Sequence, residues 1–231
     1  MSLKHAVIRT ADFFLPRLCA GCDRKLLPHY NIICPECSNS LALMHPSVLK
    51  TYYEELFSDW YCREFFSLYL FTDDSPVRNI IHKLKYSGQR NTGPWLGSLL
   101  KKRIAEISPD FKADIIVPTP IHNVKKIERG YNQSMEIARA FTERGDVLVS
   151  DDLIKKLRQT ESQTHKNFEE RRKNIRNTFG ITKRGLELIP DKNILIVDDV
   201  ITTGATTREL ISVLSEAGAA SVSVATVAVT E

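Results

Sequence analysis

Two adjacent carboxylates, Asp198 and Asp199, stand between four aliphatic residues and a short polar turn. The aliphatic run 194–197 predicts a strand that is buried on both faces of a sheet. The turn at 202–206 combines threonine hydroxyls with Gly204, where a close phosphate or a positive φ costs little. Ionised carboxylates accept hydrogen bonds from sugar hydroxyls or bind Mg²⁺, and amides at a helix N-terminus bind phosphate. The stretch therefore predicts a site for a ribose 5-phosphate group.

A structural role for this stretch is the alternative, with an aspartate capping the next helix. Two carboxylates beside a threonine and glycine turn exceed what a cap requires, so the ligand site is favoured. The helix is expected to begin near Thr206, and the turn residues predicted to hold the phosphate are Thr202, Thr203, Gly204, Ala205 and Thr206.

Four of the five cysteines form two C-x2-C pairs, Cys19 with Cys22 and Cys34 with Cys37. Four thiolates in this spacing suit a tetrahedral zinc ion, and a site closed by four protein ligands is structural. Two disulfides or a redox pair are the alternatives. Both are less favoured because no secretory signal is recognised and a cytosol keeps thiols reduced. Cys62 lies among aromatic residues and is expected to be a buried apolar side chain.

The composition, with 42% apolar residues in a chain of 231, is sufficient for one core and a small appendage. No run reaches the roughly 20 apolar residues that a membrane span needs, so we expect a soluble, cytoplasmic protein. A net charge of +4 does not by itself identify a nucleic-acid binder. Between residues 155 and 184, however, ten Lys or Arg stand against three Glu.

Strand and helix patterns alternate along the chain, which predicts an α/β fold with a mainly parallel sheet flanked by helices. Besides 194–197, the expected strands are 65–71, 113–117, 147–149 and 222–229. The expected helices are 2–14, 75–84, 93–107, 131–143 and the one after the 202–206 turn.

Pro118 and Thr119 stand where the second buried strand ends, followed by Pro120. Proline lacks an amide donor and fixes the backbone, so the amide and hydroxyl of Thr119 are expected to be the prominent donors. A rigid strand exit without ligand contact is the alternative.

Arg129 to Gln133 supply a cation, an aromatic ring at Tyr131 and amides near a helix start. An ordinary helix cap is the alternative for this segment. Residues 158–174 contain too few apolar side chains to pack, which predicts a mobile basic flap. Solvated charge accounts for much of this basic run.

The strand, the acidic pair and the Thr-Gly turn resemble the phosphoribosyl pyrophosphate (PRPP) motif of type I phosphoribosyltransferases. The resemblance implies that Asp198 and Asp199 hold the ribose and act in catalysis, and that the 202–206 turn holds the 5′-phosphate. It also implies that the strand exit at Pro118 and Thr119 is the pyrophosphate loop, and that PRPP binds with Mg²⁺.

Five features together resemble the ComF family: the cysteine pairs, the segments 83–88, 129–133 and 163–174, and the acidic pair with its turn. The resemblance covers nearly the whole chain. Such proteins join a zinc finger to a phosphoribosyltransferase domain and are associated with DNA uptake in natural transformation. The resemblance implies cytoplasmic handling of single-stranded DNA, with DNA-uptake helicases or processing proteins as partners. One departure is Lys166, where relatives commonly carry Leu after the flap Gln.

We expect the chain to divide into a zinc-ribbon-like module with an N-terminal helix (1–45), a connection with aromatic anchors (46–64) and a phosphoribosyltransferase-like domain (65–231). Two functions stay open. One is a module that binds phosphoribosyl ligands and single-stranded DNA, and the other is an active Mg²⁺-dependent phosphoribosyltransferase with an unidentified small-molecule acceptor. The residues expected at the flap and nucleic-acid surface are Arg129, Tyr131, Lys166, Arg171, Arg172 and Lys173.

Overall fold

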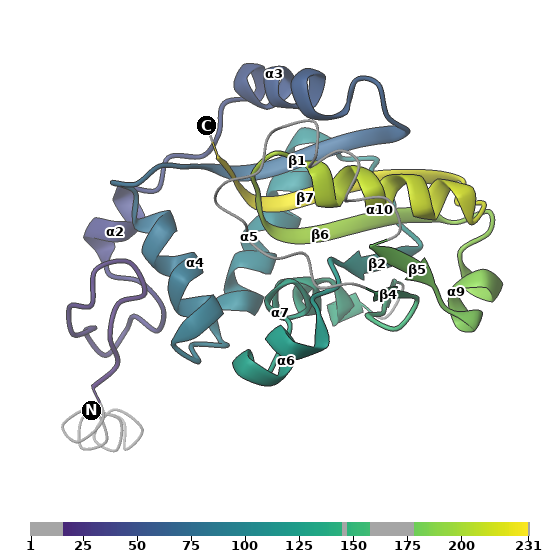
Figure 1. Ribbon diagram of the computed structural model, residues 1–231. Helices are drawn as coiled ribbons and strands as arrows, with labels where there is room; N and C mark the ends of the chain where they lie inside the picture. Colours follow the sequence, from purple (N-terminus) through teal and green to yellow (C-terminus); the bar gives the residue numbers. More distant parts are fainter. Residues whose placement is uncertain (1–15, 145–146, 158–177, 231) are drawn as a thin grey trace, which may run out of the picture.

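The computed structural model describes residues 16–144, 147–157 and 178–230 of the chain. Its centre is a five-stranded sheet in the order β1-β7-β6-β2-β3, and every neighbouring pair is parallel (Figure 1). The strands are β1 (Cys62–Phe71), β2 (Ile115–Pro118), β3 (Leu148–Val149), β6 (Asn193–Ile201) and β7 (Ser221–Thr230). A separate antiparallel pair is formed by β4 (Ile154–Lys156) and β5 (Phe179–Ile181).

Helices cover both faces of the sheet, as a parallel sheet requires. They are α2 (Pro35–Asn39), α3 (Pro46–Phe57), α4 (Pro76–Tyr86), α5 (Thr92–Ile107), α6 (Asn123–Arg129), α7 (Gln133–Ala138), the 3₁₀ helix η1 (Arg139–Arg144), α9 (Lys183–Leu188) and α10 (Ala205–Glu216). Helices α4, α5 and α7 pack on one face, while α3 and α10 pack on the other (Figure 1).

Strand β6 shows how the sequence builds this arrangement, because its aliphatic residues alternate between two cores. Leu195 and Val197 join the core under α4, α5 and α7. Ile194 and Ile196 join the core under α3 and α10. All four side chains are almost fully buried, and burying an aliphatic side chain contributes roughly 1.5 to 3 kcal/mol. The strand is therefore fixed in position directly before the acidic pair.

The predicted α/β class with a parallel sheet is confirmed, and the five predicted strands each overlap one strand of this sheet, in chain order β1, β2, β3, β6 and β7. The helix predicted at 131–143 is wrong in outline: Asn132 caps α7, which ends at Ala138 and continues as η1. Helix α3 occupies most of the predicted connection. The helix predicted at 2–14 lies outside the described residues, as do residues 158–174 of the predicted flap.

Candidate functional site

The acidic pair lies at the carboxyl end of β6, where open α/β sheets bind ligands. Asp198 and Asp199 are both buried. Oδ1 of Asp198 accepts a hydrogen bond from Ser134 Oγ at 3.0 Å and one from the Asp199 amide at 2.8 Å. Asp199 Oδ1 accepts from the Val200 amide at 2.9 Å. These bonds hold both carboxylates in one orientation.

A lysine that the sequence reasoning left without a role holds the other oxygen of Asp199. Nζ of Lys85, at the end of α4, lies 2.7 Å from Asp199 Oδ2. Burial raises the pKa of Asp198 to about 7, and the charge of Asp199 adds to this effect, whereas Lys85 and Ser134 oppose it. The pair therefore holds a proton more readily than two exposed aspartates, and a cation that binds there displaces it.

The turn after β6 leads directly into α10, whose N-cap is Gly204. Gly204 has a φ of +68°, and a Cβ there would lie 3.0 Å from Arg208 Nη1 and 3.1 Å from the Leu56 side chain. The positive φ therefore favours glycine at this position, as the sequence predicts, whereas the two neighbouring atoms are ends of flexible side chains that can shift. The first amides of α10, at Ala205 and Thr206, have no partner within the helix and face the position that suits an anion.

The strand exit at Pro118 and Thr119 lies beside this turn, because β2 pairs with β6 and Pro118 stands opposite Val197. The expectation for the Thr119 amide is wrong, since this amide donates to the Val197 carbonyl at 2.9 Å. The Thr119 hydroxyl, in contrast, is buried and has no hydrogen-bond partner among the described residues. A buried donor without a partner costs free energy, so this hydroxyl is the group that a ligand would satisfy.

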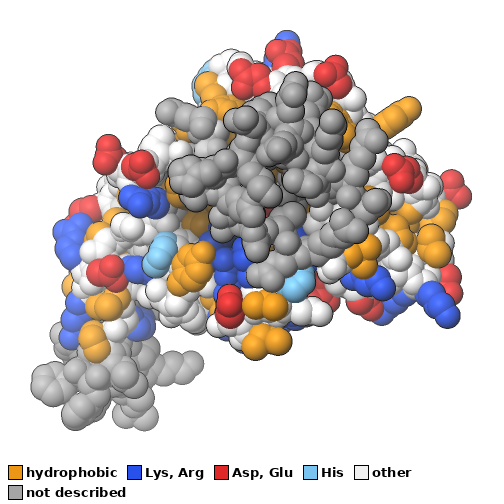
Figure 2. All heavy atoms as spheres, in the orientation of Figure 1, with side chains coloured by type: hydrophobic (Ala, Val, Ile, Leu, Met, Phe, Trp, Pro, Cys, Tyr) orange, Lys and Arg blue, Asp and Glu red, His pale blue; other side chains and the backbone are white. Residues whose placement is uncertain are grey.

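These groups line one cavity of about 210 Å³. Four basic side chains, those of Lys85, Lys125, Arg129 and Lys156, line it together with the two carboxylates. The other lining residues are Thr119, Pro120, Ile121, His122, Gln133 and residues 200–207. Figure 2 shows Lys and Arg side chains gathered at the centre of one face, between the areas of α4 and α6. A cavity with an acidic pair inside and cations at its rim suits a ligand that carries both hydroxyls and phosphates.

The sequence singled out none of Lys125, Ser134 and Lys156, whereas Gln133 belongs to the predicted 129–133 segment and does line the cavity. Gln133 and Ser134 open α7, and the Arg129–Gln133 motif was the signal for them. Lys156 stands in β4, where its Nζ lies 5.4 Å from the centre of the Phe179 ring. Burial lowers the pKa of Lys156, and the charge of Lys125 lowers it further. No short motif marks Lys156, since only the fold brings β4 to the acidic pair.

Arg129 and Tyr131 are close in sequence but differ in role, because only Arg129 lines the cavity. Arg129 lines the cavity, donates to Gln133 Oε1 at 2.9 Å and lies 5.0 Å from the centre of the Tyr86 ring. Tyr131, for which a stacking role was expected, is buried: its hydroxyl donates to the Leu84 carbonyl, and Arg90 covers its ring at 4.7 Å. The exposed aromatic ring here is that of Tyr86, which is 63% exposed.

The four cysteines of the two pairs form one cluster, in which all four Sγ atoms lie within 4.8 Å of one another. The Sγ atoms of Cys22 and Cys34 are 3.7 Å apart, close to the edge of about 3.8 Å that a tetrahedron with Zn–S bonds of about 2.3 Å has. Cys19 Sγ accepts from the amides of Gly21 and Cys34, as metal-bound thiolates do. Arg24 lowers the pKa of Cys22 to about 6. This cluster can hold a metal ion, and Cys62 is not part of it.

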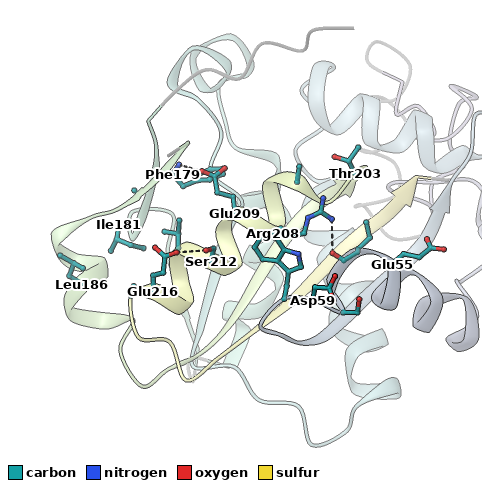
Figure 3. A pocket seen from close by; sticks show the side chains of 17 residues that line it. Glu55, Asp59, Phe179, Ile181, Leu186, Thr203, Arg208, Glu209, Ser212 and Glu216 are labelled. Atoms are coloured by element: carbon teal, nitrogen blue, oxygen red, sulfur yellow. Dashed lines mark hydrogen bonds between the residues drawn. The ribbon is translucent and has the colours of Figure 1, made fainter. Parts of the chain in front are cut away.

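A larger groove of about 1150 Å³ lies between α3, α10 and the β5–α9 region (Figure 3). Its charged lining consists of Glu55, Asp59, Glu209 and Glu216 against Arg208. Arg208 donates to the Leu56 carbonyl, and Glu209 accepts from the amides of Thr178 and Phe179. Four carboxylates against one guanidinium repel phosphates, so this groove suits a phosphate-bearing ligand less well than the smaller cavity, despite its greater volume.

Comparison with known proteins assigns the class. Residues 128–230, which include the acidic pair and the Thr-Gly turn, match the family model described as Phosphoribosyl transferase domain. The glutamine PRPP amidotransferase of B. subtilis, a solved structure, is 20% identical, and the match covers 61% of this chain and 26% of that one with a TM-score of 0.37. The family model therefore shows that residues 128–230 are similar to a phosphoribosyltransferase domain, and these residues contain β6 and β7 of the parallel sheet.

The curated relatives are more specific. The chain is 26% identical to Competence protein F of Haemophilus influenzae, over 62% of this chain and 63% of that protein. It is 28% identical to DNA utilization protein YhgH of Salmonella typhimurium, over 90% of this chain and 88% of that protein. These matches confirm the resemblance to the ComF family, because the chain is similar to both of these proteins. Among the described residues, no helix has the length and apolar character to cross a membrane.

Proposed function

We propose that this ComF-type protein binds PRPP, or a related phosphoribosyl ligand, in the 210 Å³ cavity. The observation that carries the proposal is that four kinds of group line that cavity: an acidic pair, a glycine-capped helix N-terminus, a threonine hydroxyl that has no partner among the described residues, and four basic side chains. Asp198 and Asp199 would hold the ribose hydroxyls, directly or through Mg²⁺. The 202–206 turn would hold the 5′-phosphate, and Thr119 with the lysines would hold the pyrophosphate.

The donor set fits Mg²⁺, because hard oxygen ligands and substrate phosphates are what this ion prefers. In the enzyme alternative, Mg²⁺ and the basic rim would neutralise the departing pyrophosphate. The residues of the chain would orient the ribose and leave C1′ open to the acceptor. No group among the described residues marks an acceptor subsite, so binding comes first in the proposal and transfer second.

Calorimetry with PRPP and Mg²⁺, beside ribose 5-phosphate, tests this function. PRPP should bind more tightly than ribose 5-phosphate, because only PRPP also reaches the Thr119 end of the cavity. Equal affinity for both would remove the pyrophosphate assignment, and no binding of either would remove the phosphoribosyl site. Release of pyrophosphate in the presence of candidate acceptors would favour the enzyme.

We further propose that the ion in the cysteine cluster is a structural zinc. Four thiolates fill the coordination sphere and leave no position for a reactive water, so the ion would stabilise the fold of residues around it without activating a nucleophile. Elemental analysis should find about one zinc per chain.

A second proposal, supported by the names of the relatives and by the exposed Tyr86, is cytoplasmic handling of single-stranded DNA during uptake. Tyr86 presents an aromatic face beside Arg129 and His82, whose ring centre lies 5.0 Å away. Aromatic faces flanked by cations hold successive bases of single strands. A DNA-uptake helicase or processing protein is the expected protein partner.

Arg171, Arg172 and Lys173 of the predicted flap, together with Lys166, lie outside the described residues and stay a prediction. Replacing the first three with Ala should make the slope of log affinity against log salt shallower by about 0.7 for each phosphate contact removed. Binding of DNA should weaken for unrelated sequences alike. An unchanged salt slope with loss of PRPP turnover would instead identify these residues as part of a catalytic lid.

A further inference from the structure

Helix α4 contacts the cysteine cluster through side chains near its first two turns. Asn79 Nδ2 donates to the Gly21 carbonyl at 2.7 Å. Lys83 Nζ donates to the Cys19 carbonyl at 2.8 Å and to Asp23 Oδ1 at 2.5 Å. These carbonyls belong to the first C-x2-C pair, so α4 binds the backbone that carries two of the four thiolates.

The contact is tight as well as polar. A Cβ at Gly21 would lie 2.7 Å from Cys37 Sγ and 3.2 Å from the Cβ of Pro76, the first residue of α4. Buried residues of the cysteine region, such as Cys19 and Leu26, share one core with Ile80 and Leu84 of α4. Lys83 itself is buried, and a buried ammonium needs its acceptors to stay in place.

The same helix reaches the acidic pair with its opposite side. Lys85, whose Nζ lies 2.7 Å from Asp199 Oδ2, stands two residues after Lys83. Two residues correspond to a rotation of about 200° around an α-helix, so these two lysines point to opposite sides of α4. Between them, the Leu84 carbonyl accepts the Tyr131 hydroxyl, which ties the helix to the segment that also carries Ser134.

We propose that α4 couples the metal in the cysteine cluster to the acidic pair. The metal fixes the first cysteine pair, its carbonyls fix Asn79 and Lys83, and α4 thereby positions Lys85 on Asp199. Lys83 and Lys85 are thus positioning residues for the phosphoribosyl site, which rests on the function proposed above. The cysteine cluster then serves ligand binding as well as local folding.

Coupling between two sites is reciprocal, and typical values correspond to a 5- to 150-fold change in affinity. Loss of the metal should therefore weaken PRPP binding by about fivefold or more, and PRPP should raise the affinity for the metal by the same factor. Metal affinity is measured by competition with a chelator, with and without PRPP, and PRPP affinity by calorimetry on loaded and metal-free protein.

Four variants of the full chain separate coupling from general damage. Lys83→Met should weaken both metal and PRPP binding, whereas Lys85→Met should keep the metal affinity of the ligand-free protein but remove the effect of PRPP on it. Lys85→Arg should restore part of that effect, because it keeps the charge at Asp199. Arg78→Gln, on an exposed part of α4, is the matched control and should change neither affinity. Equal metal affinity with and without PRPP, in wild-type protein that binds PRPP, would overturn the coupling.

Hydrogen exchange gives a test that does not depend on PRPP. Removing the metal should speed exchange in peptides from 76–86 and from 198–204 as well as in the cysteine region. If PRPP does not bind but both peptides respond, the proposed function fails and the coupling stands. If exchange changes only within residues 16–44, the cysteine module is energetically separate and the coupling is wrong, whether or not PRPP binds.

Discussion

The cysteine cluster and the cavity proposed to bind a phosphoribosyl ligand are built in opposite ways. The cluster takes its four thiolates from 19 consecutive positions, Cys19 to Cys37, and two short turns suffice to bring them together. The cavity takes its polar groups from the ends of α4, β2, β4, α6, β6 and the start of α10. A site built from residues close in sequence can be predicted from their spacing. A site built from residues far apart in sequence depends on the fold of the sheet that brings them together.

The largest expected effect follows from the local character of the cluster. Cys34→Ser removes one of four thiolates, and a metal held by a single small module cannot replace it from elsewhere. We expect loss of the bound metal and a fall in stability of several kcal/mol, because metal binding supplies folding free energy to such modules. Elemental analysis and limited proteolysis of residues 16–44 measure the two effects.

Cys62→Ser is the matched control for this variant. Cys62 is buried in β1 and its thiol donates to the Glu64 carbonyl, a bond that a serine hydroxyl can also make. It should retain the metal in full. A Cys34→Ser protein that keeps one metal per chain would show that the cluster is not the metal site.

The same contrast explains how much the sequence could predict. The four cysteines, the acidic pair and Gly204 are adjacent or regularly spaced, and the structure places each group together as predicted. Lys85, Lys125 and Lys156 stand on three different elements, and nothing in their spacing distinguishes them from other lysines of the chain. They become site residues only through the strand order.

Two errors have a similar physical cause. The Thr119 amide was expected to be available to a ligand, but it donates to the Val197 carbonyl. The pairing of β2 with β6 extends to Pro118, one residue beyond the end of the predicted strand. The ring of Tyr131 was expected to be available for stacking, yet α4 and Arg90 cover it. Both contacts join residues far apart in sequence, which local patterns do not report.

The next largest effect concerns the acidic pair. Replacing Asp198 and Asp199 together with Asn keeps the shape and removes the charge, and each charged hydrogen bond is worth about 1.5 to 3 kcal/mol. PRPP affinity should fall at least tenfold, by calorimetry, without a lower melting temperature. Asp110→Asn, on an exposed loop before β2, is the control and should bind as wild type. Unchanged affinity in the folded double variant would remove the ribose assignment.

The next prediction concerns how the free energy of unfolding depends on pH through Asp198, because burying this carboxylate in the cavity lowers the stability of the fold. The pKa of Asp198, about 7, lies above the value near 4 of an unfolded aspartate. Between these values the folded state binds more protons, so the contribution of Asp198 to stability falls as pH rises from about 4 to about 7. Asp198→Asn should therefore be more stable than wild type at pH 8, by roughly 4 kcal/mol for a shift of about three units, and similar to it at pH 4.

Denaturant unfolding of both proteins at several pH values measures this difference. A parallel pH series of Mg²⁺–PRPP binding to wild type should show affinity rising through pH 7, because the cation binds the ionised pair. If the stabilities of variant and wild type differ equally at pH 4 and pH 8, the buried carboxylate is not the source of the cost.

The smallest expected effect tests whether the surface beside the cavity has a function of its own. Tyr86 is exposed and has Arg129 against its ring, so truncating it removes one stacking face and leaves the fold intact. Tyr86→Ala should weaken single-stranded DNA binding by about 1 kcal/mol, roughly a fivefold change, at a fixed salt concentration. Tyr61→Ala, at another highly exposed tyrosine, should bind DNA as wild type does. Equal losses in both variants would point to nonspecific contact, and no loss in either would leave PRPP as the ligand of this face, since Arg129 serves the cavity as well as the Tyr86 ring.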